Sequence, residues 1–533
     1  MHDADDWIAA ELTERNSLKQ HNVKEAIPRS EVPQGKRIFK PRPVLKRKIN
    51  PPDAENPTGS IEKHKVRMTI AAFTKMLKQG IDYEEKHAAT VRWNSIKILV
   101  AIAVQFDFDI FLIDIKTFFL YGKLPKGSEM YMEIPAGWED SEEEVKGDYV
   151  WKLLGTLYGM PQAPHEAQKV LREVMGVGDK FKASTADDCV YVTKDHTTGY
   201  CASGTHVDDT MAIGDPKGVK KLISTLEKKF ELTIKKNPII ITGVEIERNR
   251  EKKWCKLHQG SYTTELLTKY QMLNSHLSRP VDTPMDGGTA KILMLLPTDS
   301  ATPASIKLFQ NIVGGLMWLM RTRTDMFFTI NLLARFLKCA TPQHVAIAKG
   351  RPMRYLSGTI THGLVFMPGD GTWALSGVSD ADLAGDLNTA RSTSGHTTQL
   401  GQFGCISSSS TLERKISNST GMSETYAHMG LAKEIIWDRH ILRELGFPQA
   451  DATPALTDNE GVKNQSTKAI NHAGAKHYRI AQAMIRQLNF DSVMKTTYVN
   501  TDSNPADFLT KALGGAAFAR HRLSTMGPQT CPQ

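Results

Sequence analysis

Two adjacent carboxylates stand in the stretch Thr205-His206-Val207-Asp208-Asp209-Thr210-Met211, between two short apolar segments. Residues 200–205 and 210–213 have the composition of β-strands, which predicts a hairpin with the acidic pair at its turn. Because successive side chains of a strand point to opposite faces, both acids cannot enter one core. Two like charges share a small site only where a cation neutralises them. Taken alone, the pair is also typical of a solvated hairpin tip.

A third acid stands in an apolar segment upstream. Residues 111–115 are expected to form a buried strand that carries Asp114. An unpaired buried carboxylate is costly, so this acid needs an ion-pair partner, a metal or a shifted pKa. A structural salt bridge would satisfy it equally well. The metal-ligand interpretation is favoured only if Asp208 and Asp209 lie on the neighbouring strand.

The composition is that of a globular chain with a basic excess. Its 533 residues predict about three or four domains, and 40% hydrophobic residues supply their cores. A net charge of +9 favours an anionic partner, nucleic acid first. The six cysteines form no CxxC pair and no zinc spacing, which indicates an intracellular protein without a disulfide framework. The most apolar run, 98–113, contains two aspartates, so we expect a soluble protein that does not cross a membrane.

A second group of acids stands in the C-terminal part of the chain. Residues 284–304 are expected to form a linker, followed by helices at about 305–321 and 325–339. Beyond them the order is three strands, a helix, a strand and a helix, with strands expected at 363–366, 373–379, 395–400 and 454–458. Four acids stand at the ends of these elements: Asp380, Glu424, Asp458 and Asp507. Each alone fits a helix cap or a surface acid. Together they predict a cluster able to hold two divalent cations for phosphodiester hydrolysis.

Several motifs then give the chain a family resemblance from about Trp7 to Leu513. It resembles the reverse transcriptase–ribonuclease H part of the Pol polyprotein of Ty1/copia-type retrotransposons. The acidic pair, in His206-Val207-Asp208-Asp209, is similar to the polymerase YVDD box. LIDIKTFFLYG (residues 112–122) is similar to the motif of the first catalytic Asp. The other matching segments are residues 131–137, 157–164, 313–319, 354–359, 379–386, 391–395 and 506–513.

The resemblance implies a multidomain α+β and α/β protein. A right-hand polymerase with fingers and palm (1–245) and a thumb/connection region (246–365) would precede a ribonuclease H-like domain (366–533). It implies an RNA-directed DNA polymerase with ribonuclease H activity that acts on an RNA template, a DNA primer, dNTPs and an RNA–DNA hybrid. It further implies an intracellular, cytoplasmic protein of virus-like particles, with a nuclear phase and homo-oligomers as additional expectations.

The resemblance also assigns roles to residues. Two Mg²⁺ ions, or Mn²⁺ as a substitute, would occupy each site, held by the seven catalytic acids Asp114, Asp208, Asp209, Asp380, Glu424, Asp458 and Asp507. Lys65 and Arg67 would contact the triphosphate, although they could be plain surface charges. Phe119 would exclude a 2′-hydroxyl, and Gln162 would line the nucleotide pocket; a core aromatic and a turn amide are the alternatives. His477 could touch the hybrid backbone, or be a surface histidine.

The chain departs from the family pattern beside its acids. His206 replaces the tyrosine of the YVDD box, Phe118 replaces the usual alanine before Phe119, and Ala167 replaces an aromatic residue. Ala71-Ala72 stands in place of the expected Lys/Arg-Gly, and the two-Glu pattern around Glu424 keeps only its second glutamate. All seven carboxylates are present. Three hypotheses stay open: an active enzyme, a catalytically degenerate remnant that only binds nucleic acid, and an interaction protein that uses only the C-terminal fold. No gag, protease or integrase motif is recognisable, so we expect a polyprotein fragment or a separate reading frame.

Overall fold

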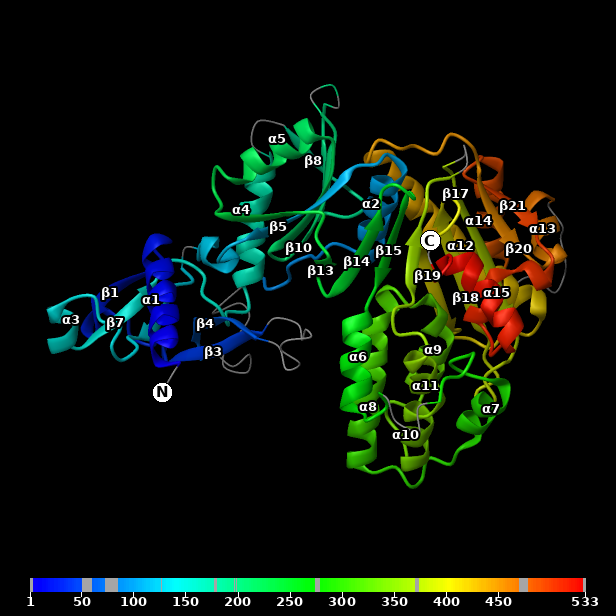
Figure 1. Ribbon diagram of the computed structural model, residues 1–533, viewed down its shortest axis with the longest axis horizontal. Helices are drawn as coiled ribbons and strands as arrows, with labels where there is room; N and C mark the ends of the chain where they lie inside the picture. Colours follow the sequence, from blue (N-terminus) through cyan, green and yellow to red (C-terminus); the bar gives the residue numbers. More distant parts are fainter. Residues whose placement is uncertain are drawn as a thin grey trace.

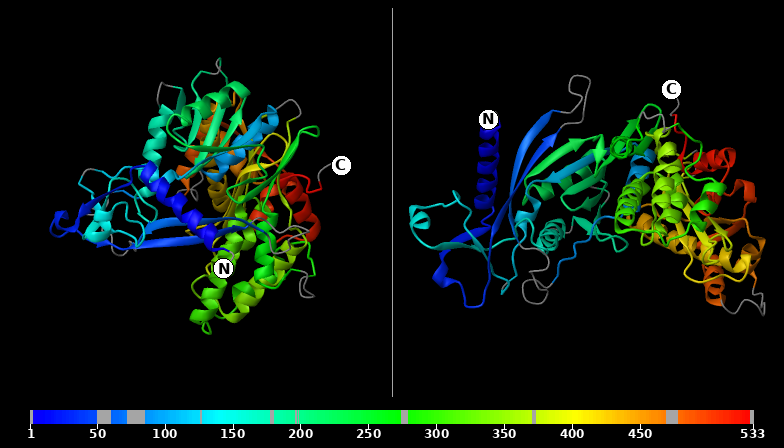
Figure 2. Two further views of the ribbon diagram at one scale, coloured as in Figure 1. Left: turned by 60° about the vertical axis from the view of Figure 1, so that its left-hand side comes forward. Right: turned by 90° about the horizontal axis from the view of Figure 1, so that it is seen from below.

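The structure is a computed structural model that describes residues 3–49, 60–71, 85–125, 127–176, 180–195, 197, 199–273, 279–369, 373–468 and 478–530. The molecule is elongated, with the N-terminal region at one end and the C-terminal sheet at the other (Figures 1 and 2). Within these ranges, no helix combines the length and apolar character that a membrane crossing requires. The cysteines in the same ranges are all unpaired.

The N-terminal region contains a four-stranded sheet, a long hairpin and a helix packed on that hairpin. Its elements are α1 (Ala4–Gln20), β1 (Lys24–Pro28), β2 (Ile38–Phe39), β3 (Pro41–Ile49), β4 (Ile61–Ile70), β6 (Met130–Glu133), α3 (Glu142–Lys146) and β7 (Tyr149–Leu153). Strand β4 carries Lys65 and Arg67, the two residues predicted to contact the triphosphate. Val66, Met68 and Ile70 are buried, which leaves Lys65 and Arg67 on the other face.

The central sheet has six antiparallel strands in the order β12-β5-β11-β10-β9-β8. They are β5 (Asp109–Ile115), β8 (Phe181–Ala183), β9 (Val190–Thr193), β10 (Cys201–His206), β11 (Asp209–Gly214) and β12 (Leu232–Lys236). Helices α4 (Ala163–Gly176) and α5 (Pro216–Leu226) cover one face. Alternation along β11 sends Ala212 to that face, and Met211 and Ile213 to the other face.

Helix α2 (Trp93–Gln105) covers the other face and joins the two halves of the molecule. Every residue from 95 to 104 is buried, as expected for a helix that is apolar on all sides. It contacts β11 on one side and β19 (Cys405–Leu412) of the C-terminal sheet on the other (Figure 1). One apolar core therefore runs from the central sheet into the C-terminal sheet.

A small sheet and a helical region follow. The sheet pairs β13 (Ile240–Ile241), β14 (Val244–Asn249), β15 (Trp254–His258) and β16 (Gly363–Phe366) in that order. The predicted domain boundaries at 245/246 and 365/366 lie within β14 and β16. The strand at 363–366 was expected in the C-terminal sheet; that expectation is wrong, because its backbone pairs with β15.

The helical region consists of α6 (Gly260–Lys269), α7 (Gly287–Leu295), α8 (Pro303–Trp318), α9 (Phe327–Ala334), α10 (Pro342–Lys349) and α11 (Arg351–Ser357). The expectation that 284–304 is a plain linker is wrong for α7. The side chain of Asp286 caps this helix by accepting from Thr289 N at 2.8 Å. Leu293 and Met294 are buried in the core of the region.

The C-terminal sheet has the order β19-β18-β17-β20-β21, with the first three strands antiparallel and β17, β20 and β21 parallel. Its elements are β17 (Leu375–Asp382), β18 (Thr393–Leu400), β19 (Cys405–Leu412), α12 (Thr420–Glu444), β20 (Thr453–Thr457), α13 (Glu460–Thr467), α14 (Arg479–Phe490), β21 (Met494–Tyr498), the 3₁₀ turn η10 (Pro505–Leu509) and α15 (Gly515–Met526). The third antiparallel strand is thus β19, a serine-rich segment that the sequence pattern did not indicate.

Candidate active sites

Three acids, here called the central carboxylates, meet at the β10–β11 turn: Asp114, Asp208 and Asp209. Asp209 lies directly opposite Asp114 in the antiparallel register, so their side chains share one face of the sheet. Ile115 N donates to the backbone oxygen of Asp208 at 3.1 Å. The condition that favoured a metal-ligand interpretation of Asp114 is therefore met.

The turn between these strands carries backbone strain. His206 pairs with Asp209, so Val207 and Asp208 form a two-residue loop. Val207 has φ 61°, a left-handed conformation that a β-branched residue rarely adopts. Such strain persists where the surrounding structure imposes it, and it clusters at functional sites.

The central carboxylates repel one another electrostatically. Burial raises the pKa of Asp209 to about 6, with further contributions from Asp208 and Asp114. Burial and the Asp208 charge likewise raise the pKa of Asp114. The Lys65 charge favours the ionised form of Asp114. Partial burial and the charges of Arg67 and Lys63 in turn lower the pKa of Lys65. This arrangement favours binding of a cation beside the acids.

Two of the predicted substrate residues meet through Tyr158. The Arg67 guanidinium lies 5.3 Å from the centre of the Tyr158 ring. Phe119 packs edge-to-face on the same ring at 5.9 Å. Burial and nearby carboxylates raise the pKa of Tyr158, so its hydroxyl stays protonated. Gln162 is buried: its Nε2 lies 3.7 Å from Met130 Sδ, and its Oε1 has no partner among the described residues.

Three of the departures from the family pattern, His206, Phe118 and Ala167, have identifiable surroundings. Burial and the Arg321 charge lower the pKa of His206, which favours the neutral form of its ring. Phe118 and Ala167 are both fully inside one core, where the 3₁₀ turn η2 (Phe118–Tyr121) packs on α4. A large residue in one position and a small one in the other conserve the volume of that core.

The C-terminal carboxylate cluster comprises Asp380, Glu424, Asp458 and Asp507. Ser379 and Thr457 are register partners on parallel strands, which places Asp380 and Asp458 side by side. Glu424 reaches them from α12, which packs on β17. One oxygen each of Asp380, Glu424 and Asp458 lies within 4.8 Å of the others, a spacing that a metal ion could bridge. Asp507 joins from η10 and pairs with Lys511 Nζ at 3.0 Å.

Burial perturbs this cluster more strongly than the central carboxylates. Burial together with Asp380 and Asp458 raises the pKa of Glu424 to about 9. Burial and the Asp507 charge raise that of Asp380 to about 7. Glu424 Oε2 and Asp458 Oδ1 have no hydrogen-bond donor within the described part of the chain. Hard oxygen donors without partners are what Mg²⁺ or Mn²⁺ requires, so the residues fit a divalent cation.

Four residues in these sites carried no predicted role. Thr510 Oγ1 donates to Asp380 Oδ2, and the Lys511 charge favours ionised Asp380. The four-residue spacing of Asp507 and Lys511 is a sequence pattern from which their ion pair could have been predicted. Tyr158 and Arg321 lie near the central carboxylates only through tertiary contacts, which no local pattern indicates. His477 lies outside the described residues.

Comparison with known proteins identifies what the chain is similar to. Residues 30–286 match the family described as reverse transcriptase (RNA-dependent DNA polymerase). The chain is also 30% identical to the Retrovirus-related Pol polyprotein from transposon TNT 1-94 of Nicotiana tabacum, over 94% of its own length. The Pol polyproteins of transposons RE2 and RE1 of Arabidopsis thaliana are 30% and 29% identical over 87% of the chain. The expected resemblance to Ty1/copia-type Pol proteins is confirmed.

The reverse transcriptase match begins in the N-terminal region and ends beyond the central sheet, so it includes all three central carboxylates. The chain spans only 36%, 30% and 30% of the lengths of these three relatives. A solved structure described as the foamy viral protease-reverse transcriptase dRH in complex with ds DNA has a TM-score of 0.47 and 11% identity, over 92% of this chain and 69% of that chain.

Proposed function

We propose that the chain is an RNA-directed DNA polymerase that also cleaves RNA in an RNA–DNA hybrid. The observation that carries the polymerase assignment is the pairing of Asp114 with Asp209 at a strained turn inside a reverse transcriptase family segment. The observation that supports the nuclease is the buried C-terminal carboxylate cluster with its unpartnered oxygens.

At the polymerase site, the central carboxylates would hold two Mg²⁺ ions, with Mn²⁺ as a substitute. Divalent cations at such a site supply neutralisation of phosphate charge and a lowered pKa of the attacking hydroxyl. Lys65 is in a position to contact the triphosphate, because its charge already interacts with Asp114 and Asp208. Phe119 would pack against the sugar, held in place by Tyr158. Gln162 would line the nucleotide pocket, where its unpartnered Oε1 would accept a hydrogen bond.

At the nuclease site, Asp380, Glu424, Asp458 and Asp507 would hold the same cations. The sheet order β19-β18-β17-β20-β21 with α12 on it is the arrangement that we expect of a ribonuclease H-like domain. Thr510 and Lys511 would orient Asp380 and Asp507, and both favour the ionised form of Asp380. RNA template, DNA primer, hybrid and dNTPs are the proposed partners. Homo-oligomers, and a cytoplasmic virus-like particle with a nuclear phase, stay predictions from the resemblance.

The test is primer extension on an RNA template with simultaneous measurement of template cleavage, in Mg²⁺ and then in Mn²⁺. The wild-type chain should show both activities. Asp208→Asn should reduce extension on the order of 100- to 1000-fold while cleavage persists, because it removes charge from one site only. Asp458→Asn should do the reverse.

Folding controls distinguish a loss of catalysis from a loss of the folded structure. Both variants should keep the calorimetric unfolding profile of the wild type and its binding to hybrid in EDTA. Equal extension by Asp208→Asn and wild type would show that the polymerase site is assigned wrongly. If the wild-type chain is folded and binds hybrid but neither extends primers nor cleaves RNA, the result would support the hypothesis of a catalytically degenerate remnant.

A further inference from the structure

A group of metal-ligating side chains lies away from both carboxylate sites, where α1 meets the β3–β4 hairpin (Figure 1). Asp3 and Asp6 stand at the start of α1, and His64 stands on β4. One oxygen of each aspartate and one ring nitrogen of His64 all lie within 4.8 Å of one another. We call these three residues the α1 site. None of the motifs that carry the family resemblance includes them.

The histidine of the α1 site is buried and has an unsatisfied ring nitrogen. The side chain of His64 is only 6% exposed, and its Nε2 makes no hydrogen bond within the described part of the chain. This atom lies 3.5 Å from Asp3 Oδ2, while Nδ1 of the same ring lies 3.7 Å from Asp6 Oδ2. Leaving a buried polar atom without a partner costs free energy, so a ligand that binds this nitrogen would stabilise the fold.

Neighbouring side chains hold the ligands of the α1 site in place. Arg47 lies opposite His64 in the hairpin register, and its guanidinium donates to Asp3 Oδ2 at 2.5 Å. The Trp7 ring packs edge-to-face on the His64 imidazole, with the ring centroids 4.4 Å apart. Such outer contacts orient the ligands of metal centres. The two aspartates carry two negative charges against the single positive charge of Arg47, and this excess favours a cation.

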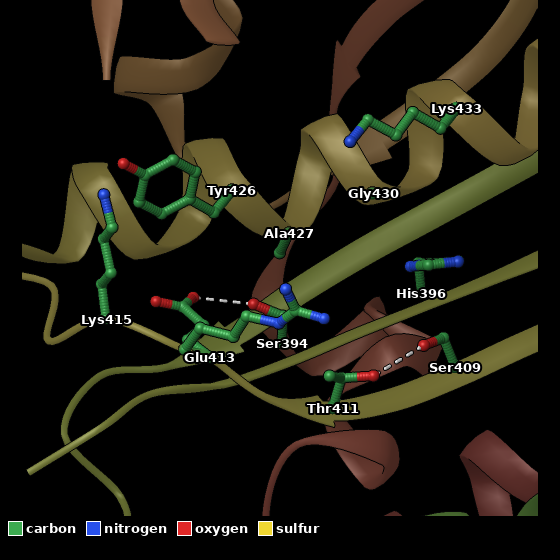
Figure 3. A pocket seen from close by; sticks show the side chains of 11 residues that line it. Ser394, His396, Ser409, Thr411, Glu413, Lys415, Tyr426, Ala427, Gly430 and Lys433 are labelled. Atoms are coloured by element: carbon green, nitrogen blue, oxygen red, sulfur yellow. Dashed lines mark hydrogen bonds between the residues drawn. The ribbon is translucent and has the colours of Figure 1, made fainter. Parts of the chain in front are cut away.

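A polar pocket on the flank of α12 has the opposite arrangement and is unsuited to a cation (Figure 3). Its acid, Glu413, already accepts hydrogen bonds from Ser394 Oγ and from Ser417 Oγ, each at 2.7 Å. The basic residues Lys415 and Lys433 line the same pocket. The α1 site, in contrast, has acids in excess and a buried ring nitrogen without a hydrogen bond.

The ligand set selects the class of metal. Mg²⁺ and Ca²⁺ take oxygen ligands, whereas imidazole favours Zn²⁺ and related transition metals. We propose that Asp3, Asp6 and His64 bind a transition-metal ion of the Zn²⁺ class, through one oxygen of each acid and one imidazole nitrogen. Three protein ligands leave a further coordination position for water. This site goes beyond the proposed function, whose Mg²⁺ ions are held by carboxylates alone.

The bound ion fastens α1 to the β3–β4 hairpin. Two contacts already join these elements: Trp7 packs on His64, and Glu14 Oε1 accepts from Met68 N at 2.9 Å. The metal adds a third attachment, at the start of the helix. Because Lys65 directly follows His64 in β4, the ion holds the strand that carries the predicted triphosphate contact.

The test titrates Co²⁺, a coloured probe of the Zn²⁺ class, into the untagged full chain in excess Mg²⁺, which competes for sites made of carboxylates alone. One equivalent should bind with visible absorption bands, and Zn²⁺ should abolish them. His64→Gln and Asp6→Asn should each weaken this binding at least about 10-fold. His440→Gln is the matched control, because this histidine has one acid, Glu444, at 3.4 Å. It should behave as the wild type, and so should Asp458→Asn, which alters the C-terminal carboxylate cluster.

Asp6 separates loss of a ligand from loss of the fold. Its side chain is 64% exposed, so the unfolding temperature of Asp6→Asn in EDTA should stay close to that of the wild type. The proposal is overturned if the wild type shows no Co²⁺ bands in Mg²⁺, or if the bands persist unchanged in His64→Gln and Asp6→Asn. An equal loss in His440→Gln or in Asp458→Asn would overturn it too, because the ion would then lie elsewhere.

Hydrogen exchange measures the attachment itself. Zn²⁺ should slow amide exchange in α1 and β4 of the wild type, and it should leave both unchanged in Asp6→Asn. A wild type that binds the ion without slower exchange in these two elements would show that the ion does not fasten them. None of these measurements requires primer extension or hybrid cleavage, so a chain without either activity would refute the proposed function while the α1 site is still decided.

Discussion

The central carboxylates and the C-terminal carboxylate cluster gather like charges in opposite ways. The central acids are half-buried and stand on two adjacent strands and their turn. In the cluster, Asp380, Glu424 and Asp507 are only 2–6% exposed and come from a strand, a helix and a 3₁₀ turn. Burial raises the pKa of Glu424 to about 9, whereas that of Asp209 is raised to about 6.

This difference in burial affects how strongly each site would depend on bound cations. The central site is open, and Lys65 and neighbouring cations already moderate its charge. Under the proposed function, a triphosphate would bring its own cation to this site. The cluster is more deeply buried and has unpartnered oxygens, so the proposed cation would relieve more electrostatic repulsion there than at the central site. Most departures from the family pattern fall around the central site, and one falls beside Glu424 of the cluster.

The largest effect should come from the core beneath the central site. Phe118→Ala should destabilise the protein by about 3–5 kcal/mol, because it empties a buried aromatic position. Ala167→Phe should cost about 1–3 kcal/mol through overpacking. The double variant should recover at least about 1 kcal/mol of the summed loss, since both residues fill one core. Calorimetry of the full chain measures this cycle; strictly additive losses would show that the two substitutions do not compensate.

The next effect concerns metal binding. Mg²⁺ should stabilise the wild-type chain against heat, by about 2.7 kcal/mol at a concentration 100 times its dissociation constant. Asp458→Asn should remove most of this gain, because Asp458 Oδ1 is one of the unpartnered oxygens. Asp209→Asn should remove little, since the central site is less deeply buried. If Asp209→Asn lost more of the stabilisation by Mg²⁺ than Asp458→Asn, the central site, and not the cluster, would depend more strongly on the cation.

The periodicity of apolar residues in the sequence predicted many of the strands and helices that carry the acids. The β10–β11 hairpin, β5 and α12 follow from it. The adjacency of Asp114 and Asp209 does not, because the sequence pattern left it only as a condition for the metal-ligand interpretation. The rest depended on tertiary context. Strand β19 contains a run of serines that looks like a loop, yet Thr397 Oγ1 bonds Ser407 O at 2.8 Å within the sheet. Strand β16 joins β15 through a pairing over a hundred residues apart in sequence. The contacts of Tyr158 and Arg321 are equally non-local.

A smaller effect should appear in the pH dependence of stability without metal. The pKa of Asp380 is raised from an ordinary 3.8 to about 7 in the folded protein. The folded state therefore binds the proton more tightly than the unfolded state, so stability present below pH 4 is lost as pH rises through about 7. In EDTA the midpoint temperature should fall between pH 5.5 and pH 8, and Asp380→Asn should reduce that fall by a few degrees.

An unchanged fall in Asp380→Asn would place the sensitivity elsewhere in the chain. Asp382→Asn is the neighbouring control. Its pKa is also raised by burial, but it does not share the cation-sized spacing of the cluster. It should leave most of the fall in place.

The smallest effect tests whether strain is stored at the central turn. Val207 has φ 61° and also packs partly against the core beneath the sheet. Val207→Ala removes that packing but keeps an unfavourable conformation. Val207→Gly removes the packing and the strain together. Glycine normally destabilises relative to alanine, yet here Val207→Gly should be more stable than Val207→Ala by about 1 kcal/mol. Thermal unfolding of the two variants decides it, and a less stable glycine variant would show that the turn is not strained. If the strain is confirmed, Val207→Gly should also slow primer extension severalfold without changing hybrid cleavage, because only the central carboxylates depend on this turn.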